Sequence, residues 1–136
     1  MSTLTNIGRN QGDTGSRGEG AAATFLRRSR GFTIVAANWR NPHDQREEID
    51  LICRDGEALV FVEVKTRAAG ALVPGYYAVN RRKKAVLRRA IRSYLRLLRH
   101  RPRLFRFDIV EVEMASGGPA VLHFESIPLF SKYFRG

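Results

Sequence analysis

The sequence predicts an α/β domain whose elements follow in the order helix, three strands, helix, two strands. Residues 13–30 and 80–100 carry apolar residues at the three- and four-residue spacing of amphipathic helices. Runs rich in Val, Ile and Phe lie between and after these stretches, as in strands, and the Asp-Gly pair at residues 55–56 predicts a tight hairpin turn. Together these three observations indicate the α/β class.

Length and composition set the outer limits of the interpretation. The chain has 136 residues, 43% of them hydrophobic and 27% charged, which is the composition of one globular domain. We expect a disordered lead-in over residues 1–13, a single domain over 14–127 and a tail over 128–136. Cys53 is the only cysteine, so an intrachain disulfide is excluded. No signal segment or bilayer-length apolar run is present, which predicts a cytoplasmic protein without membrane contact.

The first helix should begin between residues 13 and 16 and end at Arg30, with Gly31 in the left-handed conformation. Its inward stripe consists of small and apolar side chains, namely Ala22, Ala23, Phe25 and Leu26. Glu19 lies beside this stripe in the first part of the helix. Two interpretations of Glu19 stay open: favourable placement near the positive end of the helix dipole, or a third carboxylate delivered to a metal site.

The hairpin after the first strand gathers charge on one face of the predicted sheet. A turn centred on residues 55 and 56 sets Asp50 opposite Phe61 and Glu48 opposite Glu63. Because side chains alternate along a strand, one face then carries Glu48, Asp50, Glu63 and Lys65. The second strand is otherwise apolar on both faces, which is typical of a strand covered on two sides.

Carboxylates crowded at a covered position destabilise a sheet unless a cation neutralises them. Mg²⁺ is usually held by one or two carboxylates and keeps several waters, so the pattern predicts a Mg²⁺ or Mn²⁺ site at Asp50 and Glu63, diagonal neighbours in this register. Lys65 would lie beside the attacking water and the oxygen that it attacks. The alternative is an ordinary solvated strand face with a weak ion pair, which the second acidic strand disfavours.

The net charge of +11 predicts a polyanionic partner, with nucleic acid favoured over a membrane surface. In the second helix, the apolar positions Leu87, Ala90, Ile91, Tyr94, Leu97 and Leu98 should face the core. Residues 81–106 contain no Asp or Glu, so the basic side chains there lack acidic neighbours in sequence. Guanidinium groups suit phosphate contacts better than base readout, so the predicted nucleic-acid-binding residues are Arg67, Arg82, Lys83, Lys84, Arg88, Arg92 and Arg96. A merely arginine-rich soluble face is the alternative.

Four segments carry a resemblance to a known family: Glu-Ile-Asp-Leu-Ile (48–52), Val-Phe-Val-Glu-Val-Lys-Thr-Arg (60–67), Gly-Glu-x-x-Ala (18–22) and Arg-Phe-Asp (106–108). Over about residues 15–115 the chain resembles the YraN-type (UPF0102) family of bacterial proteins, described as possible endonucleases. The resemblance implies a restriction-endonuclease-like (PD-(D/E)xK) three-layer fold with a central mixed β-sheet flanked by helices, similar to archaeal Holliday-junction resolvases. It also implies catalytic roles for Asp50, Glu63 and Lys65 and a metal-binding glutamate at Glu19.

Two positions depart from the family pattern. Glu47 stands where a Gly usually precedes Glu-Ile-Asp, which would add a negative charge at the mouth of the site. Lys83 and Lys84 stand where members often carry Lys-Gln, so no Gln can fill that supporting role. Both departures bear on substrate fit more than on metal binding.

The leading hypothesis is therefore a Mg²⁺-dependent endonuclease that acts on DNA rather than RNA, on a branched or structured substrate. Cleavage of both strands would suit a twofold homodimer formed through an exposed edge strand. One alternative is a non-cleaving nucleic-acid-binding module that keeps the carboxylates for structure. The other is an RNA- or ribosome-associated accessory protein, for which the positive charge is equally suitable.

Overall fold

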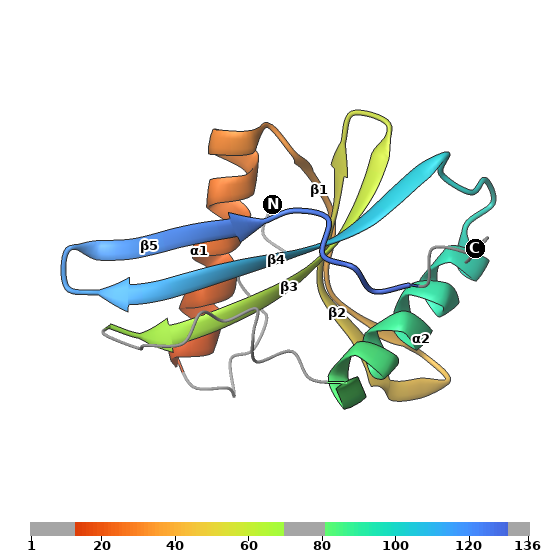
Figure 1. Cartoon of the computed structure of the whole chain (residues 1–136), viewed down its shortest axis with the longest axis horizontal. Coiled ribbons are helices and arrows are strands. Elements are labelled where there is room, and N and C mark those ends of the chain that lie inside the picture. Colours follow the sequence, from red (N-terminus) through yellow and green to blue (C-terminus); the bar gives the residue numbers. More distant parts are fainter. Residues whose placement is uncertain (1–12, 70–80, 131–136) are drawn as a thin grey trace.

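The computed structural model describes residues 13–69 and 81–130, which form a three-layer α/β fold (Figure 1). The elements are α1 (Asp13–Arg30), β1 (Thr33–Asn41), β2 (Asp44–Asp55), β3 (Ala58–Ala68), α2 (Arg81–Leu97), β4 (Leu104–Ala115) and β5 (Gly118–Phe124). This order confirms the predicted sequence of elements. Residues 1–12 of the expected lead-in and residues 131–136 of the expected tail lie outside the described residues. Asp13, expected as the last residue of the lead-in, is the first residue of α1.

The five strands form one mixed sheet in the order β1-β2-β3-β4-β5. Three of the four neighbouring pairs are antiparallel, and β3 pairs with β4 in parallel. A parallel pair needs a long crossover connection, and α2 lies in that connection. The mixed sheet flanked by helices is the architecture that the family resemblance implied.

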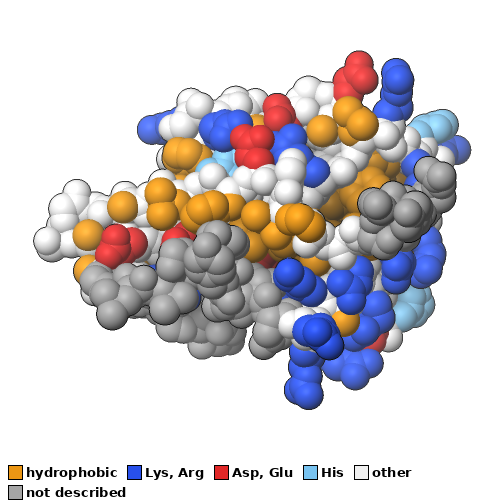
Figure 2. Space-filling view, in the orientation of Figure 1, with side chains coloured by type: hydrophobic (Ala, Val, Ile, Leu, Met, Phe, Trp, Pro, Cys, Tyr) orange, Lys and Arg blue, Asp and Glu red, His pale blue; other side chains and the backbone are white. Residues whose placement is uncertain are grey.

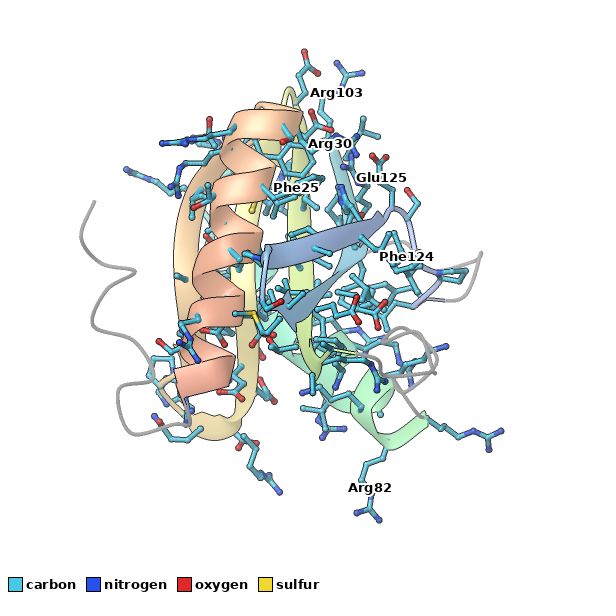
Figure 3. The ribbon with its side chains drawn as sticks, turned by 90° about the vertical axis from the view of Figure 1, so that its left-hand side faces the viewer. Phe25, Arg30, Arg82, Arg103, Phe124 and Glu125 are labelled. Atoms are coloured by element: carbon cyan, nitrogen blue, oxygen red, sulfur yellow. The ribbon has the colours of Figure 1, made fainter. Side chains whose placement is uncertain are left out.

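The two helices cover different faces of the sheet, so the core has two halves (Figures 1 and 3). On one face, Leu87, Ala90, Ile91 and Leu95 of α2 pack with Ile52, Phe61, Phe107 and Ile109 of the sheet. On the other face, Ala22, Ala23 and Leu26 of α1 pack with Leu51, Cys53, Val60, Val62 and Val110. Because β3 contributes to both clusters, its apolar side chains are buried on both faces, as the sequence predicted.

Helix α1 ends where the sequence predicted. Gly31 has a φ of 73°, a left-handed value that costs a residue without Cβ little strain. The chain then turns back, and the N–H of Phe32 donates to the carbonyl of Leu26 at 2.9 Å, which satisfies one free carbonyl at the helix end. Neither described helix combines the length and apolar character that crossing a bilayer requires.

The register of the β2–β3 hairpin differs from the predicted one. Asp55 pairs with Ala58 and Ile52 pairs with Phe61, so the two central turn residues are Gly56 and Glu57 rather than residues 55 and 56. Gly56 has a φ of 62° at the first central position, which is the pattern of a type II′ turn. The shift moves each partner by two residues, which keeps the parity of the pairing but changes each neighbour. The predicted alternation breaks at Asp50, because Ile49 packs on the α2 side of the sheet and Leu51 on the α1 side.

Cys53 lies fully buried on the α1 face of β2. Burial, and to a lesser extent the nearby charge of Asp108, raises the pKa of its thiol to about 12. Only the thiolate reacts readily, so we expect Cys53 of the folded protein to react with a disulfide reagent at least about 10³-fold more slowly than a free thiol. Reaction rates measured with and without concentrated guanidinium check this, and fast labelling of the folded protein would contradict it.

Candidate functional site

The sheet divides at Asp50 and Glu63, where β2 and β3 part. These strands pair from the turn as far as Leu51 with Val62, and the next pair in that register would be Asp50 with Glu63. Beyond this point β2 continues along β1 and β3 continues along β4. The two carboxylates therefore stand directly across the opening of a fork, rather than diagonally as the predicted register had them.

At the fork, the carboxylate of Asp50 accepts a hydrogen bond from a backbone amide of β3. Its Oδ2 accepts a hydrogen bond from the N–H of Val64 at 2.8 Å, which gives this amide a side-chain partner beyond the last β2–β3 pair. The pKa of Asp50 lies well above its usual value of 3.8, first because the carboxyl is buried and then because Glu63 repels its charge. Lys83 opposes this shift but does not cancel it. Negative charge at Asp50 is thus under-compensated by the described residues.

Glu63 is buried and faces the α2 side of the sheet, with only 5% of its surface exposed. The Nζ of Lys65, two residues along β3, lies 3.7 Å from its Oε2. The Nζ of Lys83, in the first turn of α2, lies 3.5 Å from the same oxygen. Glu63 and Lys65 therefore lie together, Asp50 is within electrostatic reach of Glu63, and α2 adds a second ammonium. Glu48, the fourth member of the predicted group, pairs instead with Arg40 at 2.9 Å.

Glu19 approaches the same charges from α1. Its Oε1 accepts a hydrogen bond from Asn38 Nδ2 at 3.1 Å. Burial raises the pKa of Glu19, the Asn38 hydrogen bond lowers it, and the charges of Glu48 and Glu63 raise it again, with a net upward shift. Glu19 thus lies within electrostatic reach of the fork.

Asn38 is a site residue that the sequence reasoning missed. It has a φ of 51° in the middle of β1, between the pairs Ala37–Leu51 and Trp39–Ile49 that bracket Asp50. Asparagine tolerates left-handed backbone better than most residues, and this irregularity directs its amide to Glu19. The sequence signal that could have identified this residue is an Asn inside a strand-like run of Val, Ala and Trp.

The close approach of α1 to β3 depends on Gly18. A Cβ at this position would overlap the hydroxyl of Thr66 and stand 2.9 Å from its Cγ2 and 3.0 Å from its Cβ. Rotation of the Thr66 side chain cannot clear the space, because the residue is branched at Cβ. The glycine therefore lets the first part of α1, with Glu19, lie against the far half of β3.

Gly18→Ala is expected to destabilise the protein by about 1–3 kcal/mol through overpacking, although alanine is the better helix former. Gly20→Ala is the matched control in the same helix, where nothing lies within 4 Å of the added Cβ, so a gain of about 1 kcal/mol is expected. When Thr66→Ala is combined with Gly18→Ala, the double variant should regain much of the lost stability. Urea unfolding of wild type, the two glycine variants and the double variant measures these effects. Equal effects of the two glycine substitutions would contradict the packing argument.

The donor set at the fork fits a hard divalent cation. Asp50 and Glu63 offer two carboxylates whose mutual repulsion such a cation would relieve, and Mg²⁺ is commonly held by two carboxylates and several waters. Among the residues that the structure describes, no three His, Cys, Asp or Glu side chains stand together as a ready set of ligands. With its carboxylate hydrogen-bonded to Asn38, Glu19 is placed to assist through water rather than to complete such a set.

Glu47 is not an added charge at the mouth of the site, as the departure from the family pattern suggested. It is 7% exposed, and its Oε1 accepts hydrogen bonds from Asn41 Nδ2 at 2.9 Å and Ser93 Oγ at 2.7 Å. Its other carboxylate oxygen lies 4.0 Å from Arg89 Nε. Glu47 therefore ties the start of β2 to α2, because polar groups of both elements satisfy its buried carboxylate.

The last described residues of the chain contact part of the predicted row of basic residues on α2, so the members of the row differ in exposure. Arg88 Nη1 donates to the carbonyl of Leu129 at 3.1 Å, and the guanidinium of Arg92 lies 5.5 Å from the centre of the Phe130 ring. Both arginines are partly buried, as is Lys84. In the fourth member of the row, Arg96, the side chain is exposed.

The outward face of α2 carries a different row. Arg82, Arg89 and Arg96 are exposed and spaced by seven residues, about two helical turns, so they lie along one line. The expected core position Leu97 was wrong, because it is 62% exposed, and Leu95 is buried instead. Lys and Arg side chains gather over α2 in Figure 2, and Arg82 projects away from the fold in Figure 3. Arg89 was missed because the four-residue pattern drew attention to the neighbouring row.

Arg67 and Lys83 have acidic partners within the protein. Arg67 Nε lies 3.1 Å from Glu111 Oε2 across the β3–β4 pair, and Lys83 lies beside Glu63 as described above. Both side chains keep part of their surface in solvent, 25% for Arg67 and 35% for Lys83. Lys83 therefore borders the fork from the helix, whereas Arg67 is held against β4.

Comparison with known proteins places the chain in a family. The family described as "Uncharacterised protein family UPF0102" matches residues 18–112, which include Glu19, the fork, α2 and most of β4. A UPF0102 protein of Nitratidesulfovibrio vulgaris is 43% identical over 97 residues, 71% of this chain and 69% of the relative. A second, from Symbiobacterium thermophilum, is 45% identical over 104 residues, 76% of this chain and 85% of the relative.

A third relative extends the match. A UPF0102 protein of Koribacter versatilis is 41% identical over 118 residues, 87% of this chain and 80% of the relative. The matched region contains every carboxylate of the fork and both lysines beside Glu63. The chain therefore belongs to the uncharacterised protein family UPF0102.

Proposed function

We propose that this protein is a metal-dependent endonuclease that hydrolyses phosphodiester bonds of DNA. One observation carries the proposal: two carboxylates of neighbouring strands, Asp50 and Glu63, lie within electrostatic reach of each other where the strands separate, with lysine ammonium groups beside Glu63. Burial and mutual repulsion raise the pKa of Asp50, so this arrangement reduces rather than increases the stability of the apo protein. Functional sites commonly retain such uncompensated charge.

Each residue has a defined role in this proposal. Asp50 and Glu63 would hold Mg²⁺ or Mn²⁺, with Glu19 assisting through water. A cation bound there would supply Lewis-acid stabilisation of the phosphate and activation of water. Lys65 would orient the attacking water or stabilise the charge that develops on the phosphate. The Val64 amide fixes the Asp50 carboxylate in place, and Asn38 does the same for Glu19.

The basic face of α2 supports DNA as the substrate. Arg82, Arg89 and Arg96 lie in one exposed line, and guanidinium groups contact phosphates without regard to base sequence. We propose a structured or branched DNA substrate by analogy with the restriction-endonuclease-like fold, an argument from fold alone. Access to such a substrate implies a cytoplasmic location. Cleavage of both strands would suit a twofold dimer through the β5 edge, where Leu122 is 56% exposed.

Cleavage of a panel of supercoiled, single-stranded, flap and four-way-junction DNA with Mg²⁺ or Mn²⁺ tests this proposal. Wild type should cut at least one substrate, and Glu63→Ala and Lys65→Ala should each lose the activity. Glu57→Gln, an exposed carboxylate in the turn of the same hairpin, is the control and should cut normally. A wild type that binds DNA but cuts none of these substrates with either metal would refute the nuclease assignment.

A non-cleaving nucleic-acid-binding module is the second candidate. The observation in its favour is that Lys65 and Lys83 already lie near Glu63, so the charges have partial partners without any metal. Such a module should bind DNA equally well in chelator, and Asp50→Ala should leave its affinity unchanged or increased. Competition between duplex RNA and branched DNA then separates a DNA-binding role from an RNA- or ribosome-associated one.

A further inference from the structure

Two ammonium groups approach the same oxygen of Glu63 from different elements. The Nζ of Lys65 on β3 lies 3.7 Å from Oε2, and the Nζ of Lys83 on α2 lies 3.5 Å from it. The carboxylate side chain is 6% exposed, whereas the lysines are 30% and 35% exposed. Each lysine therefore extends from the buried carboxylate toward solvent, where a phosphate would arrive.

The distances indicate loose electrostatic contacts with Glu63. A charge-assisted hydrogen bond between an ammonium and a carboxylate is about 2.7–2.9 Å long, and both lysines stand farther from Oε2 than that. Lys83 also lowers the pKa of Asp50, so it acts on both carboxylates of the fork. A phosphate oxygen can therefore replace Glu63 as the partner of either lysine without the loss of a short hydrogen bond to Glu63.

We propose that Lys83 is a second catalytic lysine, which contacts the phosphate to be cleaved while Asp50 and Glu63 hold the divalent cation. This inference rests on the proposed nuclease function. In the transition state, negative charge grows on the phosphate oxygens, and a cation already in position stabilises that charge without reorganisation. Lys65 would act from the strand side and Lys83 from the helix side of the same phosphate. Sequence reasoning gave Lys83 only a general role in binding the DNA backbone.

The neighbouring Lys84 provides a matched control. It carries the same charge on the same turn of α2, but its side chain leaves the helix about 100° away from that of Lys83. General attraction of DNA should depend on both lysines to a similar extent. Chemistry at the fork should depend on Lys83 alone.

The test uses full-length protein in excess over a labelled DNA that wild type cuts, chosen from the panel above. Lys83→Ala should slow single-turnover cleavage by about 10²-fold, the scale for removal of one group that stabilises transition-state charge. Its affinity for the same DNA, measured by fluorescence anisotropy with Ca²⁺ in place of Mg²⁺, should fall by less than about threefold, since one phosphate contact among many is lost. Lys83→Arg should recover part of the rate because it keeps the charge. Lys84→Ala, the control for general attraction, should lower the affinity by about the same factor as Lys83→Ala and slow single-turnover cleavage by no more than that factor.

The outcomes separate this inference from the proposed function. If wild type cuts and Lys83→Ala cuts equally fast, the inference is wrong and the nuclease assignment stands. The inference is also wrong if Lys83→Ala and Lys84→Ala lose the same amount of rate and affinity, because that would indicate general backbone binding. A wild type without activity on any substrate refutes both. Lys83→Met repeats the test with a side chain of similar length, so that lost packing does not decide the result.

Discussion

Asp50→Asn is expected to abolish metal-dependent cleavage and, at the same time, to raise the free energy of unfolding in chelator. The loss of activity should reach at least about 10³-fold, the upper scale for one group that stabilises a transition state. The gain in stability follows because the substitution removes a buried charge that Glu63 repels. The Asn carbonyl oxygen can still accept the hydrogen bond from the Val64 N–H.

The two opposite effects distinguish a functional carboxylate from a structural one. Urea unfolding in chelator and in Mg²⁺ measures the stability, and single-turnover cleavage measures the activity. Mg²⁺ should stabilise wild type more than Asp50→Asn, because ligand binding to the folded state alone adds to the free energy of unfolding. Glu57→Gln in the exposed turn should leave both quantities unchanged. An Asp50→Asn protein that is less stable than wild type in chelator would indicate a structural carboxylate and favour the non-cleaving module.

Local signals in the sequence predicted the elements and the burial of the central strand. The end of α1 at Arg30 follows from Gly31, and the burial of β3 on both faces follows from its unbroken apolar run. The proximity of Glu63 and Lys65 was predictable because side chains alternate along a strand, whereas around Asp50 the alternation of β2 breaks, with Ile49 and Leu51 on opposite faces. The register was wrong by two residues because Gly56 occupies the first central position of the turn instead of the second.

The features that escaped prediction depend on contacts between distant segments. The left-handed backbone of Asn38 is stabilised only where Glu19 lies beside β1, and no local pattern specifies that contact. Arg88 and Arg92 read as a phosphate-binding row until Leu129 and Phe130 fold back on α2. Helical periodicity gives the apolar side of a helix but not which part of the polar side another segment covers.

A network of charges centred on Asp108, whose register partner on β3 is Val62, also supports the fold. Asp108 on β4 is fully buried and accepts hydrogen bonds from Arg106 Nε at 3.0 Å and from the N–H of Ser126 at 2.9 Å. His123 Nδ1 accepts from Arg30 Nη1, so its Nε2 carries the proton and donates to Asp108 Oδ2 at 2.8 Å. Glu125 pairs with Arg30 at the surface, beside it in Figure 3.

Asp108→Ala is expected to lower the free energy of unfolding by about 3–5 kcal/mol, because it leaves Arg106 and His123 partly or fully buried without their anion. Glu125→Gln removes a carboxylate of the same network that is 39% exposed, and should lower it by less than about 1 kcal/mol. Urea unfolding at neutral pH measures both. Equal losses in the two variants would contradict a special role for the buried carboxylate.

The pH dependence of stability gives Asp108 a second test. Burial raises the pKa of its carboxyl, but hydrogen bonds from His123, Arg106 and the Ser126 amide outweigh burial, so the pKa lies below the ordinary value of 3.8. A depressed pKa means that the carboxylate stabilises the folded state above pH 3.8 and loses this effect as the pH falls through the folded-state pKa. The difference in unfolding free energy between wild type and Asp108→Asn should therefore stay constant from neutral pH down to about pH 5 and shrink below about pH 4. If the difference shrinks near pH 6 instead, titration of another group causes the acid sensitivity. The charge of Asp108 would then not be what stabilises the network.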